Sequence, residues 1–437
     1  TCPPTGPVAL VNCFTDPDYG PWYVTDDPYV SYSSGSNYYT LDGWGAALNV
    51  HWDRGSWALR SITGFRHQRI GSGLDPDGSP IIMFQQDFFE ESDHFSQEFQ
   101  LSGLAFGERL NWVAGVYYAS EDAMMQSGAL VLQPLWTQTL PPPRPPHIDN
   151  STTFRMWQDS KSAAAFGQGT YQLTEKLSLT AGARYSQDEK DASRERQRVN
   201  TGVLYIPRAS IDESWSAVSG RLGFEYRWNP EVMTYVSAAR GYKGGGINAA
   251  GITTQEFTIF DPEFLWTYEL GLRSDWLDQR LRFNVSAFYS DYKDLQFRSL
   301  RVDPSGAPIN LVDNVAAAEI TGLEVELIAV PAPGWEVSAG FGYMDAQYNE
   351  IEPGTPGVTK AMKFPNTPEW SLTLSSQYTR PLPGGAEFTG RVDYAYTAEQ
   401  QLTVINTPYL VQDAHPMLNA RLAYRSSGGR WEVAVFG

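Results

Sequence analysis

The chain has 437 residues and a formal net charge of −18, and aromatic residues make up 14% of it. The negative charge excludes nucleic acid as a partner, because neutralising phosphates requires a basic face. No apolar run approaches the length of about 18 residues that a transmembrane helix needs. The 14 Trp and 24 Tyr are instead typical of the aromatic rings that flank a membrane at its two interfaces.

Two cysteines, Cys2 and Cys13, enclose a short loop rich in Pro, Asn and Asp. Their even number predicts a disulfide and an oxidising compartment, with two free thiols as the alternative. A zinc site is disfavoured because no histidine lies nearby. Residues 1–40 are interpreted as part of an extracellular loop without a signal peptide, and we expect the natural protein to continue beyond both ends of this sequence.

From residue 41 onward, pairs of strand-like segments are joined by short turns that carry Gly, Pro, Asn or Asp, as tight hairpins require. Most segments are long enough to cross a bilayer at a tilt, which takes about 9–11 residues. The expected pairs are 42–52 with 56–67, 94–103 with 108–120, 161–173 with 177–187, 215–228 with 231–240, 265–275 with 280–291, 317–329 with 335–345, 367–379 with 386–396, and 415–425 with 430–437.

Long connections alternate with these short turns. Compact soluble domains rarely contain so many long connections, whereas an outer-membrane barrel has short turns at one rim and long loops at the other. The hairpins therefore predict about 16 strands of an all-β fold, a transmembrane antiparallel up-and-down β-barrel. The long connections are expected at 68–93, 121–160, 188–214, 241–264, 292–316, 346–366 and 397–414.

Side chains alternate in character within the expected strands. Leu281, Phe283 and Val285 are apolar, whereas Arg282 and Asn284 between them are polar. The same alternation is found at 177–185, 323–327, 335–343 and 418–424. We expect the charged face to line a lumen, because a charge turned towards lipid costs about 2–4 kcal/mol near the midplane. A soluble all-β binding domain, such as a propeller, is the alternative, with its charged face in water.

The strand expected at 231–240 ends at a glycine-rich stretch, Gly241-Tyr242-Lys243-Gly244-Gly245-Gly246-Ile247-Asn248. This stretch lacks the glycine–lysine order of a phosphate-binding loop and the helix that follows such a loop. Successive glycines end a β-ladder. We therefore interpret the stretch as a strand that reaches the membrane edge and passes into an outer loop.

Four segments resemble those of TonB-dependent outer-membrane receptors. Tyr235–Asn248 resembles the family's Y-x-S-x-x-x-G-Y-K-x-G-G-x-N segment, and Asp313–Glu326 resembles its N-x-(A/G)-x-(A/S)-x-x-x-G-x-E-x-E strand. Phe95–Leu101 resembles its S-Q-E-(L/F)-(Q/R)-L strand, and Arg430–Gly437 its penultimate strand. The resemblance covers nearly all of 41–437 and implies a partial barrel with about 16 of about 22 strands. A plug domain, a TonB-contact segment and a closing strand are expected outside this sequence.

The resemblance implies active uptake of a scarce, bulky nutrient across the outer membrane of a Gram-negative bacterium, with energy from a TonB-type protein. A ferric siderophore is expected first, and vitamin B12, haem and oligosaccharides are other substrates of the family. The implied state is a monomer in outer-membrane lipid, without a cofactor. A passive porin-like channel is the alternative function. No arrangement of Ser, His and Asp indicates hydrolysis, so an outer-membrane lipase is only the enzyme alternative.

In this family the plug fills the lumen, so inward-facing charges are expected to contact the plug or one another. These residues are Arg184, Glu269, Arg273, Arg282, Glu324, Glu326 and Arg421. Substrate contacts are expected in the outer loops, because binding residues concentrate on loops held by a rigid scaffold. The candidates are Tyr242, Lys243, Asn248, Trp136 and Phe84, with loop packing as their alternative role. The histidines are scattered without metal-ligand spacing, so no metal site is predicted.

Overall fold

The computed structural model describes residues 37–75, 84–131, 151–199, 201–249, 256–302, 308–352 and 358–437, together with positions 27, 30, 33, 35 and 355. Cys2, Cys13 and Trp136 lie outside these residues, so the disulfide and the role of Trp136 stay predictions. Most of the loop portion expected at 1–40 lies outside them as well. Within the described part of the chain, no helix is long and apolar enough to cross a membrane.

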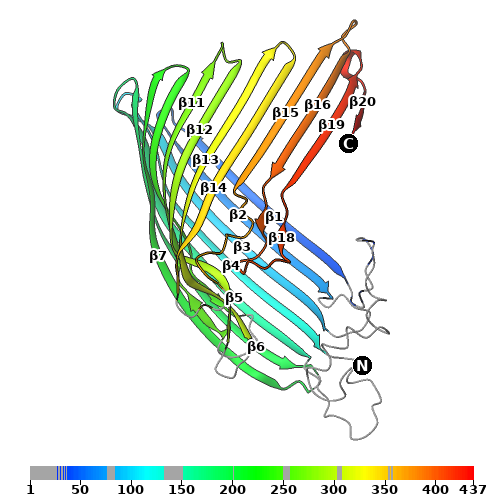
Figure 1. Ribbon diagram of the computed structural model, residues 1–437. Coiled ribbons are helices and arrows are strands. Elements are labelled where there is room, and N and C mark those ends of the chain that lie inside the picture. The colour runs from blue at the N-terminus through cyan, green and yellow to red at the C-terminus, as the bar shows by residue number, and fades with distance from the viewer. Residues whose placement is uncertain are drawn as a thin grey trace.

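Sixteen strands form one antiparallel sheet whose order follows the chain, with β1 and β20 at its two edges. Figure 1 shows this sheet curled into a trough, with short turns such as those joining β11 to β12 at the upper rim. The predicted up-and-down arrangement is confirmed. The strands are β1 (Tyr38–Asp53), β2 (Trp57–Leu74), β3 (Phe84–Ala105), β4 (Leu110–Val131), β5 (Thr152–Gln172), β6 (Leu177–Arg198), β7 (Leu204–Asn229), β8 (Val232–Lys243), β11 (Glu263–Trp276), β12 (Leu281–Val302), β13 (Pro308–Ala332), β14 (Trp335–Ile351), β15 (Trp370–Pro381), β16 (Glu387–Thr397), β19 (His415–Arg425) and β20 (Glu432–Phe436).

Two short hairpins lie outside the large sheet. β9 (Gly246–Asn248) pairs with β10 (Thr258–Phe260), and β17 (Gln400–Gln401) pairs with β18 (Val411–Gln412). Because these hairpins interrupt the sequence of large strands, β8 pairs with β11 and β16 pairs with β19. A short 3-10 turn, η4 (Ser427–Gly429), joins β19 to β20.

The strands are longer at the outer rim than the sequence predicts. The strand expected at 177–187 runs as β6 to Arg198, and the connection expected at 188–214 is reduced to 199–203. The strand expected to end at Arg240 runs as β8 to Lys243. Beyond the bilayer both faces of a strand meet water or protein, so the alternation that marks a strand in lipid is lost while backbone pairing continues.

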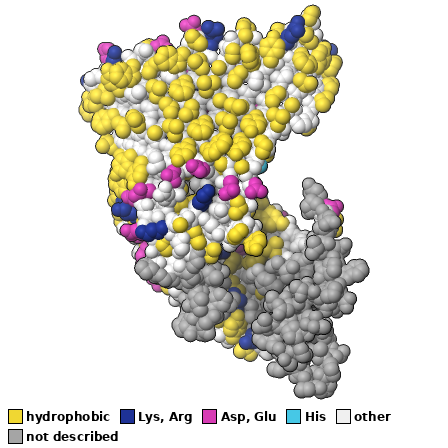
Figure 2. Space-filling model, in the orientation of Figure 1, with side chains coloured by type: hydrophobic (Ala, Val, Ile, Leu, Met, Phe, Trp, Pro, Cys, Tyr) yellow, Lys and Arg dark blue, Asp and Glu magenta, His cyan; other side chains and the backbone are white. Residues whose placement is uncertain are grey.

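The register of the sheet separates apolar rows from polar rows. Val285 lies opposite Val325, whereas the neighbouring Asn284 lies opposite Glu326. The outward apolar side chains are exposed, and Leu270 is 62% exposed. Figure 2 shows hydrophobic side chains as a broad band over the upper part of the molecule, with charged side chains below it. Phe283 and Val325 are partly exposed rather than enclosed between two layers, so the soluble alternative is excluded.

A row of aspartates crosses the sheet towards the outer rim. Each aspartate lies directly opposite the next on successive strands from β3 to β7, and all are exposed. Carboxylates are costly in hydrocarbon, so this aspartate row marks where the bilayer has ended. Its members are Asp93, Asp122, Asp159, Asp191 and Asp212.

Candidate functional site

As predicted, the large strand β8 ends at the glycine-rich stretch, and the connection that follows folds against the wall of the trough. The inner hairpin comprises residues 244–249 and 256–260, including β9 and β10. It lies against Trp215 of β7, which is 8% exposed. A Cβ on Gly245 would lie 2.4 Å from the Trp215 ring. The absence of a side chain at this position is therefore what allows the hairpin to approach the wall.

Two cations of β6 hold the inner hairpin in place. Lys190 Nζ donates to the carbonyl oxygen of Gly245 at 2.9 Å, and Arg194 Nη1 donates to that of Ala249 at 2.8 Å. Arg194 is 1% exposed, and its guanidinium lies 4.7 Å from the centre of the Phe257 ring. Lys190 lies beside the aspartate row, outside the bilayer, and burial lowers the pKa of its ammonium group.

The three candidate residues of the glycine-rich stretch have different surroundings. The Asn248 side chain exchanges two hydrogen bonds with the backbone of Val312 in β13, donating at 2.8 Å and accepting at 2.8 Å. The Tyr242 hydroxyl donates to the carboxylate of Asp188. The Lys243 side chain is 63% exposed, and its ammonium group lies 3.7 Å from the carboxylate of Glu263 in β11. Asn248 therefore anchors the hairpin to β13, whereas Tyr242 and Lys243 at the end of β8 each pair with a carboxylate of the wall.

A second segment, which includes Val358 and Phe364, folds onto the outer ends of β12 to β14. Phe364 covers a buried apolar group there, stacked on Tyr348 with ring centres 4.1 Å apart. Lys363 N donates to Asn406 Oδ1 at 2.6 Å, and Asn406 Nδ2 donates to Lys363 O at 3.0 Å, which fixes the covering segment. Burial in this group, beyond the bilayer, raises the pKa of Tyr348 to about 12. The rim cluster consists of Phe297, Val315, Ala316, Ala318, Tyr348 and Val358.

Deeper on the inner wall, a lumen hollow of about 460 Å³ gathers several predicted lumen charges. Arg273, Glu324 and Glu326 line it. The Tyr235 hydroxyl donates to Glu269, and the Arg273 guanidinium lies 5.7 Å from the centre of the Tyr235 ring. The lumen hollow therefore combines two carboxylates with one guanidinium, and a third carboxylate, Glu269, is bound to its Tyr235; this excess of negative charge suits a partner carrying positive charge.

Two other predicted lumen charges have partners on neighbouring parts of the wall. Arg282 Nε donates to Asp275 Oδ1 at 2.9 Å. Arg184 Nε donates to Ser186 Oγ at 3.0 Å, and its guanidinium lies 5.4 Å from the centre of the Tyr117 ring. The contact of Arg282 with Asp275 joins residues directly opposite each other on β12 and β11, whereas Arg184 and Ser186 share one face of the same strand.

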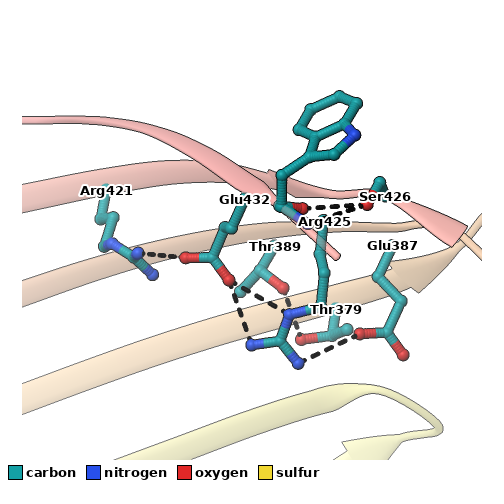
Figure 3. A network of polar contacts seen from close by, with 8 residues as sticks. Thr379, Glu387, Thr389, Arg421, Arg425, Ser426 and Glu432 are labelled. Atoms are coloured by element: carbon teal, nitrogen blue, oxygen red, sulfur yellow. Dashed lines mark hydrogen bonds and ion pairs between the residues drawn. The ribbon is translucent and has the colours of Figure 1, made fainter. Parts of the chain in front are cut away.

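Arg421 belongs to a network near the short-turn end of β16, β19 and β20 (Figure 3). Its guanidinium lies 2.5 Å from Glu432, which also pairs with Arg425 at 3.1 Å. Arg425 reaches Glu387 on the next strand at 4.0 Å. The network ties three strands together with charges that would otherwise lack partners in this wall.

Sequence reasoning missed the residues that seat the inner hairpin, which are Asp188, Lys190, Arg194 and Trp215. Three lie in the long connection expected at 188–214 and the fourth lies at the start of the next expected strand, so their roles were hidden by the error in strand length. Asp188, Lys190 and Arg194 each lie an even number of residues after Arg184. In a strand this spacing places all of them on the same face as Arg184, and this is the signal that could have found them. Phe84 begins β3, opposite Val131.

The described part of this wall offers surfaces suited to non-covalent binding. Among the described residues, no group of three or more His, Cys, Asp or Glu side chains is arranged to hold a metal ion. The inner hairpin and the segment covering the rim cluster provide hydrogen-bonded backbone, aromatic rings and charged side chains. Such a surface can select a ligand by shape and charge.

The chain matches a family model described as TonB dependent receptor-like, beta-barrel, over residues 10–437. The pesticin receptor of Yersinia enterocolitica is 24% identical over 279 residues, covering 64% of this chain and 37% of that protein. The metal-pseudopaline receptor CntO of Pseudomonas aeruginosa is 23% identical over 352 residues, covering 76% of this chain and 46% of that protein.

Two solved structures show the same fold. The ferric yersiniabactin uptake receptor FyuA from Yersinia pestis matches with a TM-score of 0.72 at 18% identity, covering 92% of this chain and 60% of that chain. The siderophore receptor PiuA from Acinetobacter baumannii matches with a TM-score of 0.67 at 17% identity, covering 90% of this chain and 60% of that chain. The chain therefore spans 37% to 60% of the length of these four proteins.

Proposed function

Because this chain belongs to the TonB-dependent receptor family, as part of its outer-membrane β-barrel, we propose that it serves the energy-driven uptake of a ferric siderophore. The observation that carries the proposal is the family match over residues 10–437. The printed names of FyuA and PiuA, a ferric yersiniabactin uptake receptor and a siderophore receptor, support the substrate class. A TonB-type protein supplies the energy, and the barrel wall is not an enzyme.

The inner wall divides into two working regions in this proposal. The lumen hollow around Tyr235, with Glu269, Glu324 and Glu326, faces a plug domain that presents cationic side chains. The outer region, shaped by the inner hairpin and the rim cluster, faces the arriving ligand. Lys243 has a 63% exposed side chain that pairs with Glu263 at 3.7 Å, and it is the candidate cation of this outer region for the negative charge of a ferric chelate. Phe84 and Trp136 remain candidate contacts.

Uptake of radioactive iron from a panel of ferric siderophores tests the proposal in a deletion strain complemented with the full-length protein. Accumulation that requires both the protein and TonB is the expected result. Equal accumulation in a strain lacking TonB contradicts active transport. Planar-bilayer conductance is the second readout, because a persistently open pore supports the passive channel instead.

A further inference from the structure

A second hollow, of about 240 Å³, opens on the wall formed by β2 to β5. It is separate from the lumen hollow around Tyr235, which lies on β8 and β11 to β15. Ser92 lies directly opposite Ala123 at its centre, and Gln68 and Gln158 continue the same row on each side. Two small side chains flanked by longer ones produce the depression. We refer to it as the thioether hollow.

The two ends of the thioether hollow differ in chemistry from its centre. At one end Glu90 lies opposite Met125, which lies opposite Met156. At the other end Glu121 lies opposite His94. Glu90 and His94 are four positions apart on one strand, which corresponds to about 13 Å at the usual rise per residue. The hollow thus has a carboxylate towards each end and flexible, polarisable thioethers beside one of them.

Three carboxylates line this hollow, and Glu91 is the one that pairs with a cation, Arg69, at 2.7 Å. Glu90 and Glu121 have no hydrogen bond or ion pair with any side chain in the described part of the chain. Lys190 and Arg194, which share the wall on β6, donate to the inner hairpin instead. Glu121 acts on Lys190 only through its electrostatic field. Arg66 of β2 lies opposite His94, two strands from Glu121.

These features fit an organic cation better than a metal ion. The described residues contain no group of three or more His, Cys, Asp or Glu side chains suited to a metal. Ammonium groups pair with carboxylates and amide oxygens, and the methylene groups attached to them pack on thioethers. A chain with an ammonium group at each end would reach both carboxylates.

We propose that the thioether hollow is a subsite for an alkylammonium group of the transported ligand. This inference rests on the proposed uptake function and adds a chemical feature that the ligand must carry. The ammonium group binds Glu90 or Glu121, and the attached alkyl chain lies on Met125 and Met156. A ligand with two ammonium groups engages both ends of the hollow and binds more tightly than one with a single charge.

Carbon-13 methyl labelling of methionine in the full-length protein provides a direct readout. Met125→Leu and Met156→Leu assign the two signals. Titration with 1,4-diaminobutane is expected to shift both signals, with weaker shifts from butylamine and none from butanol. Glu90→Gln or Glu121→Gln is expected to weaken diamine binding by about tenfold, since each removes a charged hydrogen-bond partner. Ala123→Phe fills the centre of the thioether hollow and is expected to abolish the shifts of both methionine signals.

Asp122→Asn is the matched control, because Asp122 follows Glu121 in the sequence but belongs to the aspartate row on the opposite face and does not line the hollow. Unchanged diamine binding is expected for this variant. Absence of shifts in the unmodified protein, or equal weakening by Asp122→Asn, overturns the proposal. Siderophore uptake without diamine binding refutes the subsite alone, whereas diamine binding without siderophore uptake refutes the proposed function.

Discussion

Gly245→Ala is expected to lift the inner hairpin from the wall. The added Cβ would lie 2.4 Å from the Trp215 ring and 2.7 Å from the carbonyl oxygen of Phe260, and neither is a flexible chain end. Overpacking of this kind costs about 1–3 kcal/mol. Opening the hairpin relieves the clash but gives up the hydrogen bond from Lys190 to the backbone of residue 245. The open population should therefore rise by a factor of about 5 to 160.

Hydrogen exchange followed by mass spectrometry measures that population in the full-length protein in lipid nanodiscs. Backbone amides at 244–249 are expected to exchange faster in Gly245→Ala by the same factor. Gly241→Ala is the control, because a Cβ there meets no atom within 4 Å. Neither glycine has a positive φ, so backbone strain does not distinguish the two variants. Equal exchange in both variants, or unchanged exchange in Gly245→Ala, would refute the reasoning.

Three further changes test other parts of the structure. Asn248→Ala removes two hydrogen bonds to the backbone of β13 and should cost about 1–3 kcal/mol locally; unchanged amide protection at 308–312 would contradict the anchoring role. Phe364→Ala uncovers Tyr348, so the pKa of Tyr348 should fall from about 12 towards its ordinary value. The titration of Tyr348 is followed as the part of the tyrosinate absorbance that Tyr348→Phe removes. An unaltered titration would contradict the burial of Tyr348 in the rim cluster. Val285→Arg should lower the free energy of unfolding of the barrel in vesicles by about 2–4 kcal/mol more than Ser286→Arg does, as measured by urea unfolding. Equal losses of unfolding free energy in the two variants would show that the two faces of the strand are not distinct.

The hairpins of the sheet were predictable because lipid imposes a simple rule on each strand. Every second residue must be apolar, and the short turns need Gly, Pro, Asn or Asp. Leu281 to Val285 obey this rule, and the register confirms the two faces. The outer halves of the strands were not predictable in this way, since polar residues such as Asp191 and Asp212 can face water there on either side.

The candidate site was predictable only in part because it depends on contacts between distant segments. Nothing near Gly245 in the sequence indicates that Trp215 lies beneath it. Asn248 was singled out by the family pattern, but its partner Val312 is 64 positions away. Asp188, the partner of Tyr242, lies 54 positions away. Local patterns identify strands, whereas the inward folding of a loop is decided by the surface on which it packs.

Spin labelling along β12 in lipid vesicles tests the membrane orientation of the sheet most directly. A nitroxide is placed in turn at positions 283, 284, 285 and 286, and its relaxation by oxygen and by a water-soluble nickel chelate is measured. Oxygen, which concentrates in lipid, should dominate at Phe283 and Val285, and the nickel chelate should dominate at Asn284 and Ser286. Accessibility that does not alternate between these positions, or that alternates in the opposite sense, would contradict the account.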